Sequence, residues 1–246
     1  MSFFQELQQR NKWLYITGCT LFSFGIISLG FLLFDNRYVD GISLWILPFR
    51  YSIGSGVYVF TLGWLSYLIN DNKHRNWITF FLSFISIGFL AIILIQLLNG
   101  KIAFLNDQNP FDHLMNQLSL GLTSLFLLFQ IIVTIIFYRQ RKNIHSQHYT
   151  WGVRMGMLTF AIFSILVFGF FIFVFDDLYA LLELYKNKKG IGLDTQIAFY
   201  MGIHSVQIIP LLSYYLFDQK KQVVLFTFSY ITLILVLFIS FLLRIF

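Results

Sequence analysis

The sequence predicts an all-α fold, a polytopic membrane bundle of seven transmembrane helices. Hydrophobic residues make up 58% of the 246 positions, and charged residues only 11%. Soluble domains carry about 25% charged residues, so a soluble core is excluded. Apolar stretches of about 20 residues, the length that crosses a bilayer, recur along the whole chain. We therefore expect a single transmembrane domain covering 1–246 in contact with a lipid bilayer.

The seven predicted spans follow one another with short connections. The first resembles a signal peptide but is too long, and it runs into Asp35 without a small-residue cleavage site, so we interpret it as an anchor. The second follows Pro48, which favours a helix start. The others are bounded by polar or charged turns, and we expect a short amphipathic helix at 178–185 in the fifth loop. The spans lie near 13–34, 51–69, 77–98, 113–138, 151–175, 195–217 and 223–243.

Charge predicts the orientation of this bundle. Basic residues outnumber acidic ones in the N-terminal tail and in the second, fourth and sixth loops, whereas acids balance them in the other loops. The positive-inside rule then predicts a cytoplasmic N-terminus and a C-terminus outside. The net charge of +6 comes from residues scattered in these short loops, so no nucleic-acid partner is expected. The sequence does not indicate an oligomeric state.

Ionisable and strongly polar residues inside spans are hypotheses of function, because burying them in lipid is costly. His204 lies in the sixth span with Gln207 on the same helical face, and Pro210 follows and removes a helical hydrogen bond. Either His204 is a hydrogen-bonded structural histidine, or it serves as a ligand, a proton shuttle or a metal-binding residue. Arg154 either reaches toward lipid phosphates or pairs within the bundle, and its Gly152 and Gly156 neighbours favour close helix packing.

A second set of polar residues gathers at the outer side. Arg50 is either an interface anchor or a residue that holds Asp112, Asp194 or the anionic group of a ligand. The remaining members are polar side chains of the third loop and of the start of the fourth span. Together with His204 and Gln207 they predict an outward-facing polar pocket, with Asn106, Asn116 and Gln117 at its rim and Asp112 beside them.

The chain offers little for cofactor chemistry. Cys19 is the single cysteine, which excludes an intrachain disulfide and a cysteine metal cluster. No lysine lies in a span, so a retinal Schiff base has no attachment point. Of the five histidines only His113 and His204 fall in spans or at their outer ends, and at different depths, so neither haem nor a three-histidine zinc site is expected. We predict no cofactor and no metal.

Several segments resemble an uncharacterised family of bacterial multi-pass membrane proteins. The resemblance rests on Asp35-x-Arg37 with Trp45, Pro48 and Arg50, and on the run Gly202-x-His204-x-x-Gln207-x-x-Pro210. It implies a multi-pass protein of the cell membrane, in bacteria the inner membrane, and brings no established activity. Two family histidine positions are Phe104 and Phe199 in this chain, so a histidine-pair centre is not expected here.

Three functions remain open on the sequence alone. The leading hypothesis is a protein that binds a small or lipidic ligand in the outward-facing pocket, with transport or sensing through helix movement at Pro210. The second is a membrane enzyme acting on lipid or quinone, with His204 as general base and Asp112 or Asp194 as its partner. The third is a structural or assembly protein in which His204 bonds only within the bundle.

Overall fold

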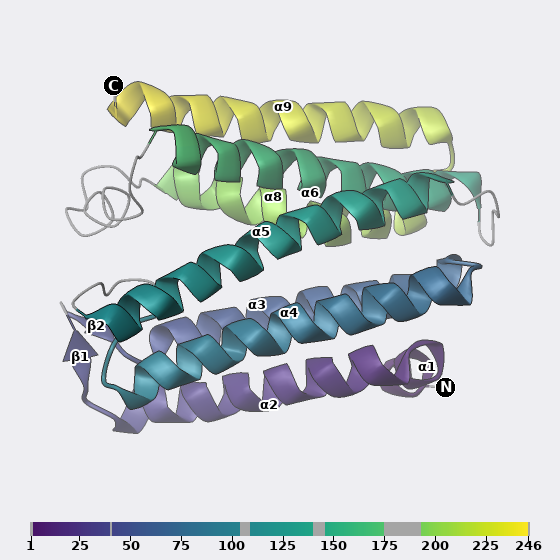
Figure 1. Cartoon of the computed structure of the whole chain (residues 1–246). Helices are drawn as coiled ribbons and strands as arrows, with labels where there is room; N and C mark the ends of the chain where they lie inside the picture. The colour runs from purple at the N-terminus through teal and green to yellow at the C-terminus, as the bar shows by residue number, and fades with distance from the viewer. Residues whose placement is uncertain (1, 40, 104–108, 140–145, 175–192, 246) are drawn as a thin grey trace. The chain divides into compact units, whose positions relative to one another are not determined.

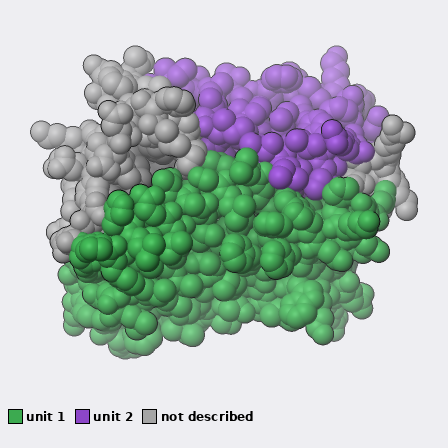
Figure 2. Space-filling view, in the orientation of Figure 1, with its two compact units in different colours: residues 1–129 green, residues 130–246 purple. Residues whose placement is uncertain are grey.

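The described residues are helical apart from one short hairpin and the connecting turns, which confirms the all-α prediction. The computed structural model describes residues 2–39, 41–103, 109–139, 146–174 and 193–245 (Figure 1). The chain divides into two compact units, residues 1–129 and 130–246 (Figure 2). Asn106 and the amphipathic helix expected at 178–185 lie outside the described residues.

Among the described residues, five helices are long and apolar enough to cross a membrane. These are α2 (Lys12–Phe34), α4 (Asn72–Leu98), α5 (Pro110–Arg139), α6 (Gln147–Val174) and α9 (Lys220–Ile245). The sequence forms helices here because long apolar runs without water must satisfy every backbone group internally. Two further helices, α3 (Ile46–Leu65) and α8 (Leu193–Tyr215), coincide with the second and sixth predicted spans but are not among these five.

Unit 1 contains α1 to α4 and the first part of α5. α2 packs along α3, and α4 packs on both of them. Hydrogen bonds join α2 to α4 from Asn11 to Thr79 at 2.7 Å and between Thr17 and Ser83 at 2.9 Å. Because both pairs advance in the same direction along the two helices, α2 and α4 run parallel. Both helices therefore begin at one end of the unit and finish at the other.

A short helix that the sequence analysis did not predict, α1 (Phe3–Arg10), precedes the first span. Ser2 and Gln5 form a capping box at its start. Its Arg10 guanidinium lies 3.7 Å from the ring centre of Trp64 and 3.8 Å from that of Tyr67, and it donates to the Trp64 carbonyl at 3.1 Å. Cation–π contacts of this kind fasten α1 to the end of α3, which continues there into the 3₁₀ turn η1 (Ser66–Leu68).

A hairpin closes the opposite end of unit 1, between α2 and α3. Strand β1 (Tyr38–Val39) pairs antiparallel with β2 (Ile42–Ser43), and Gly41 supplies the positive φ of 77° that the turn requires. After the hairpin, Leu44 and Trp45 pack on Leu97 and Ile102 at the end of α4. The hairpin therefore connects the end of α2, the start of α3 and the end of α4 into one small apolar core.

Unit 2 contains the rest of α5 with α6, α8 and α9. α6 packs along α8, and α9 packs against both. Its apolar centre is formed by Phe163 of α6, Ile209 of α8 and the residues Tyr230 and Ile234 of α9. Tyr230 also donates its hydroxyl to the Met201 carbonyl at 2.7 Å, so α8 and α9 are joined by a hydrogen bond as well as by packing.

Candidate functional site

The polar end of unit 1

Four helix ends meet at the hairpin end of unit 1. α2 finishes there, α3 begins there, and the chain returns there between the end of α4 and the start of α5. We call this region the polar end; it contains Arg50, Gln96, Lys101, Asp112 and Asn116. Most of the residues that the sequence analysis placed on the outer side therefore belong to one end of one unit.

Asp112 is the most deeply placed acid of this region. Its side chain is 0% exposed, and its Oδ2 forms an ion pair with Nζ of Lys101, which is partly exposed. The Asn109 side chain accepts a bond from the Asp112 backbone N–H at 2.9 Å, which helps to start α5. An acid in the first turn also interacts favourably with the helix dipole. The partner of Asp112 is thus Lys101, where the sequence had suggested Arg50 as one candidate.

Gln96 is a buried amide near the end of α4. Its side chain is 0% exposed, and neither Oε1 nor Nε2 has a hydrogen-bond partner among the described residues. The same is true of Oδ1 of Asp112 within that part of the chain. The backbone carbonyl of Gln96 accepts from the backbone N–H of Lys101 at 3.0 Å. This bond joins Gln96 to the lysine that pairs with Asp112. A buried polar group without a partner costs about 1–3 kcal/mol.

The predicted rim residues lie around these groups. Arg50 is exposed in the first turns of α3, Asn116 is half-buried, and Gln117 is exposed. The side chain of Asp194, the other acid considered for Arg50, lies outside the described part of the chain. The polar end thus combines an exposed cation with buried amide and carboxylate oxygens.

The cap over the polar end

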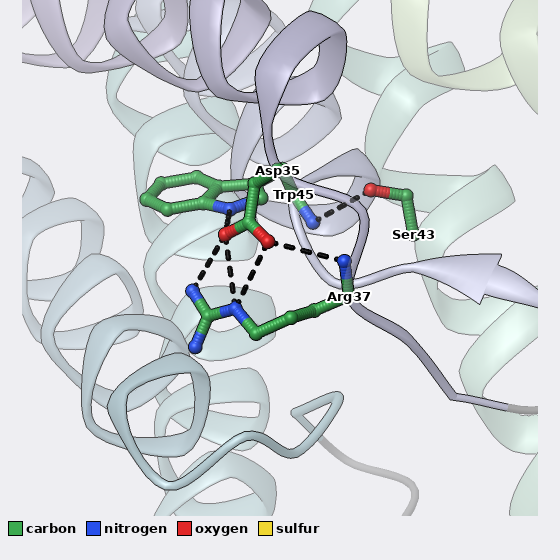
Figure 3. Close-up of polar contacts among 4 residues, drawn as sticks. All are labelled: Asp35, Arg37, Ser43 and Trp45. Atoms are coloured by element: carbon green, nitrogen blue, oxygen red, sulfur yellow. Dashed lines mark hydrogen bonds and ion pairs between the residues drawn. The ribbon is translucent and has the colours of Figure 1, made fainter.

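A carboxylate fixes the hairpin to the helices, a role that the sequence did not predict. Asp35, directly after α2, accepts from Nη2 of Arg37 at 2.7 Å and from the indole N–H of Trp45 at 2.7 Å (Figure 3). The Trp45 ring also stacks on Phe31 of α2, with ring centres 4.3 Å apart. The Asp-x-Arg spacing directly after an apolar run was the available sequence signal for a local ion pair.

These contacts change the acidity of the carboxyl group. The hydrogen bonds from Arg37, and after them the bond from Trp45, hold the pKa of Asp35 well below its usual range. The pKa of Arg37 is raised in turn by Asp35. The group is therefore charged at all ordinary pH values, and we interpret it as a structural cap.

The predicted residues of unit 2

His204 and Gln207 lie in the middle of α8. The His204 ring is half-buried and lies nearly parallel to the exposed ring of Tyr200, with centres 6.3 Å apart. Gln207 is half-buried, and its Oε1 is buried without a partner in the part of α8 and its neighbours that the structure describes. Among the described residues, no group of three His, Cys, Asp or Glu could hold a metal ion.

Pro210 belongs to a close contact between α6 and α8. A Cβ atom added to Gly156 would lie 2.9 Å from the Ser205 carbonyl oxygen and 3.0 Å from Cδ of Pro210. One added to Gly152 would lie 2.3 Å from the Ser213 hydroxyl. The hydroxyl of Ser205 donates across the interface to the Gly156 carbonyl at 3.3 Å. The close packing predicted from the Gly-x-x-x-Gly spacing is confirmed, and the surface it meets is the proline turn of α8.

Arg154 is half-buried on α6. Its Nε donates to the Phe137 carbonyl of α5 at 3.3 Å, and its guanidinium carbon lies 5.6 Å from the Trp151 ring centre. Of the two interpretations offered by the sequence, the structure supports a bond within the bundle. Arg154 therefore connects the last turn of α5 to the first turns of α6.

Comparison with known proteins

The fold and its polar groups define a helical protein with several helices suited to cross a membrane. Comparison with protein-family models, with curated proteins and with solved structures finds no match for this chain. The resemblance to a bacterial membrane family therefore stays a prediction based on the quoted residues.

Proposed function

We propose that this chain is an integral membrane protein that binds a small or lipidic ligand with an anionic group at the polar end of unit 1. The observation that supports the proposal most directly is Gln96, a fully buried amide with both polar atoms unpaired among the described residues. Buried polar groups in proteins nearly always have a partner. A ligand that bonds to this amide would supply one.

Charge supports an anionic group in that ligand. Arg50 is exposed at the same end and takes part in no ion pair among the described residues. Its planar guanidinium can bind a carboxylate or phosphate through two parallel hydrogen bonds. Asn116 and Gln117 would contribute amide groups at the rim. In the predicted outward-facing pocket, transport or sensing would follow from binding.

Gentle purification followed by native mass spectrometry tests this proposal. We expect a bound small molecule on the wild-type protein and its loss in Arg50→Gln. Arg75→Gln, which removes the same charge at the other end of unit 1, is the matched control and should keep the ligand. Gln96→Leu should also lose the ligand, yet raise the thermal midpoint, because it removes an unpaired buried amide worth about 1–3 kcal/mol.

The proposal is contradicted if the wild-type protein carries no small molecule, or if Arg50→Gln and Gln96→Leu both retain it. The role of His204 in unit 2 is tested separately. An unchanged thermal midpoint in His204→Ala would contradict the structural role. A large fall in the midpoint would instead favour the structural role.

We further propose that α3 and α8 also cross the membrane, which gives seven spans with the N-terminus in the cytoplasm. The alternating excess of basic residues supports this orientation. A cysteine-free background is obtained by Cys19→Ser alone. In intact cells, an impermeant maleimide should label Asn36→Cys and Lys188→Cys but not Asn72→Cys or Gln219→Cys. Labelling of Asn36 and Asn72 from the same side would contradict a spanning α3.

A further inference from the structure

A groove runs along unit 1 between α2 and α4, away from the polar end. Its volume is about 610 Å³, within the range of ligand sites in proteins. It begins where α2 and α4 begin, whereas the polar end lies where both helices finish. Its lining includes Trp13, Thr17, Phe80, Ser83, Phe84 and Ile87.

The chemistry of the groove is apolar at the walls. Trp13, Phe80 and Phe84 are more than half exposed, with 68% of Trp13 accessible. The hydroxyls of Thr17 and Ser83 bond to each other at 2.9 Å, so neither requires a polar ligand. A hydrocarbon chain is the kind of group that such aromatic walls bury well.

The length of the groove matches one leaflet of a bilayer. Its lining on α4 extends from Asn76 to Ile87, which at about 1.5 Å per residue is roughly 16 Å. The hydrocarbon core of a bilayer is about 30 Å thick. An acyl chain that enters at the Asn76 end would therefore reach about the middle of the membrane.

The entrance to the groove is positively charged. Lys12 is the first residue of α2 and Lys73 the second of α4, and both are exposed. In the part of the chain that the structure describes, neither forms an ion pair, and the Oδ2 atom of the neighbouring acid Asp71 lies 2.8 Å from Nδ1 of His74. The two lysines are thus available to a negative group at the membrane surface.

We propose that this groove binds one anionic phospholipid, with an acyl chain between α2 and α4 and the phosphate group beside Lys12 and Lys73. The charge at the entrance selects the headgroup, and the aromatic walls bind the chain. This site is separate from the ligand site proposed above, because the two lie at opposite ends of the parallel helices α2 and α4.

Native mass spectrometry of the purified full chain tests the proposal with two probes, phosphatidylglycerol and phosphatidylcholine of identical chains. We expect one phosphatidylglycerol to be retained in preference to phosphatidylcholine. Lys73→Gln should reduce that preference about fivefold, the effect of one lysine near an anionic surface. Lys221→Gln, which changes the exposed second residue of α9, is the matched control and should have no effect.

Two further variants locate the lipid. Ile87→Trp fills the inner end of the groove and should lower retention, whereas Ile95→Trp, two turns further along α4, should not. Phosphatidylglycerol with brominated chains should quench the fluorescence of wild-type protein more than that of Trp13→Phe. The Lys73 and fluorescence measurements remain informative even if a groove-filling variant fails to fold.

The proposal is overturned by equal retention of the two lipids, or by lipid that is retained without quenching Trp13. It is also overturned if the mass spectrum shows a dimer that Ile87→Trp dissociates, since the groove would then be a contact between two copies. Each of these results leaves the ligand site at the polar end unaffected, because its test uses Arg50 and Gln96.

Discussion

Single charged residues fix the ends of unit 1. Arg10 holds α1 against Trp64, Asp35 holds the hairpin through Arg37 and Trp45, and Lys101 neutralises Asp112. Each of these groups lies at or near a helix terminus, where the apolar spans give way to polar turns. The charges at these positions therefore determine how the helix ends are joined, and substitutions there test the structure directly.

Asp35→Asn should lower the thermal midpoint and flatten its dependence on acid pH. The folded-state pKa of Asp35 is depressed, so its contribution to stability is complete above the unfolded value of about 3.9. It is lost progressively as the pH falls below that value. Thermal unfolding from pH 3 to pH 7 should show this loss in the wild type and a smaller one in the variant.

The control for that measurement is Asp218→Asn. Asp218 is exposed at the turn between α8 and α9, and no ion pair of its side chain occurs among the described residues. Its substitution should leave the decrease of the thermal midpoint between pH 7 and pH 3 unchanged. The same decrease in the wild type and in Asp35→Asn would contradict the assigned role of the cap.

Lys101→Met should destabilise the protein by about 3–5 kcal/mol, because it leaves the buried carboxylate of Asp112 without a countercharge. The double variant Lys101→Met, Asp112→Asn removes the charge as well and should recover most of the loss. The free energy of unfolding in detergent micelles, measured for both single variants and the double, gives the coupling. Additive losses would show that the two side chains do not interact.

At the scale of elements, the contact between α6 and α8 depends on small residues. Gly152 and Gly156 allow the proline turn of α8 to approach the α6 backbone. Because the hydrophobic effect does not drive helices together inside a bilayer, membrane helices associate through close packing of this kind. A methyl group added at Gly156 has little space, because its nearest neighbour is the backbone oxygen of Ser205, which cannot rotate away.

Gly156→Ala should therefore destabilise the protein by about 1–3 kcal/mol, the usual cost of overpacking. Gly121→Ala in α5 is the matched control, since a Cβ added at Gly121 meets nothing within 4 Å. Alanine favours helix over glycine by about 1 kcal/mol, so this control should be neutral or slightly stabilising. Thermal midpoints in one detergent compare the two variants, and equal shifts would argue against a tight α6–α8 contact.

At the scale of the whole molecule, composition predicts the helices better than their ends. Five predicted spans correspond to helices that could cross a membrane, because an apolar run of sufficient length has few alternatives in lipid. α4 begins at Asn72, five residues before the expected start, since hydropathy marks the apolar part of a helix and not its polar first turn. α1 was missed because an eight-residue helix with five polar side chains gives no apolar run.

The candidate site was predicted in part. The sequence placed Asp112, Asn116 and Arg50 on one side, and the order of helices in unit 1 brings them to one end. It did not reveal that Lys101 pairs with Asp112, because the partner of a loop residue depends on the path of the chain between α4 and α5. Burial of both Gln96 and Asp112 likewise depends on neighbours that only the folded unit supplies.

The contacts that join α2 and α3 at their two ends have a consequence for synthesis of the protein. At one end Asp35 meets Trp45, and at the other Arg10 meets Trp64 and Tyr67. All of these partners lie within the first 67 residues and therefore precede α4 in the chain. The first helical hairpin can therefore close while the rest of the chain is still being translated, and it would offer later helices a finished surface on which to pack.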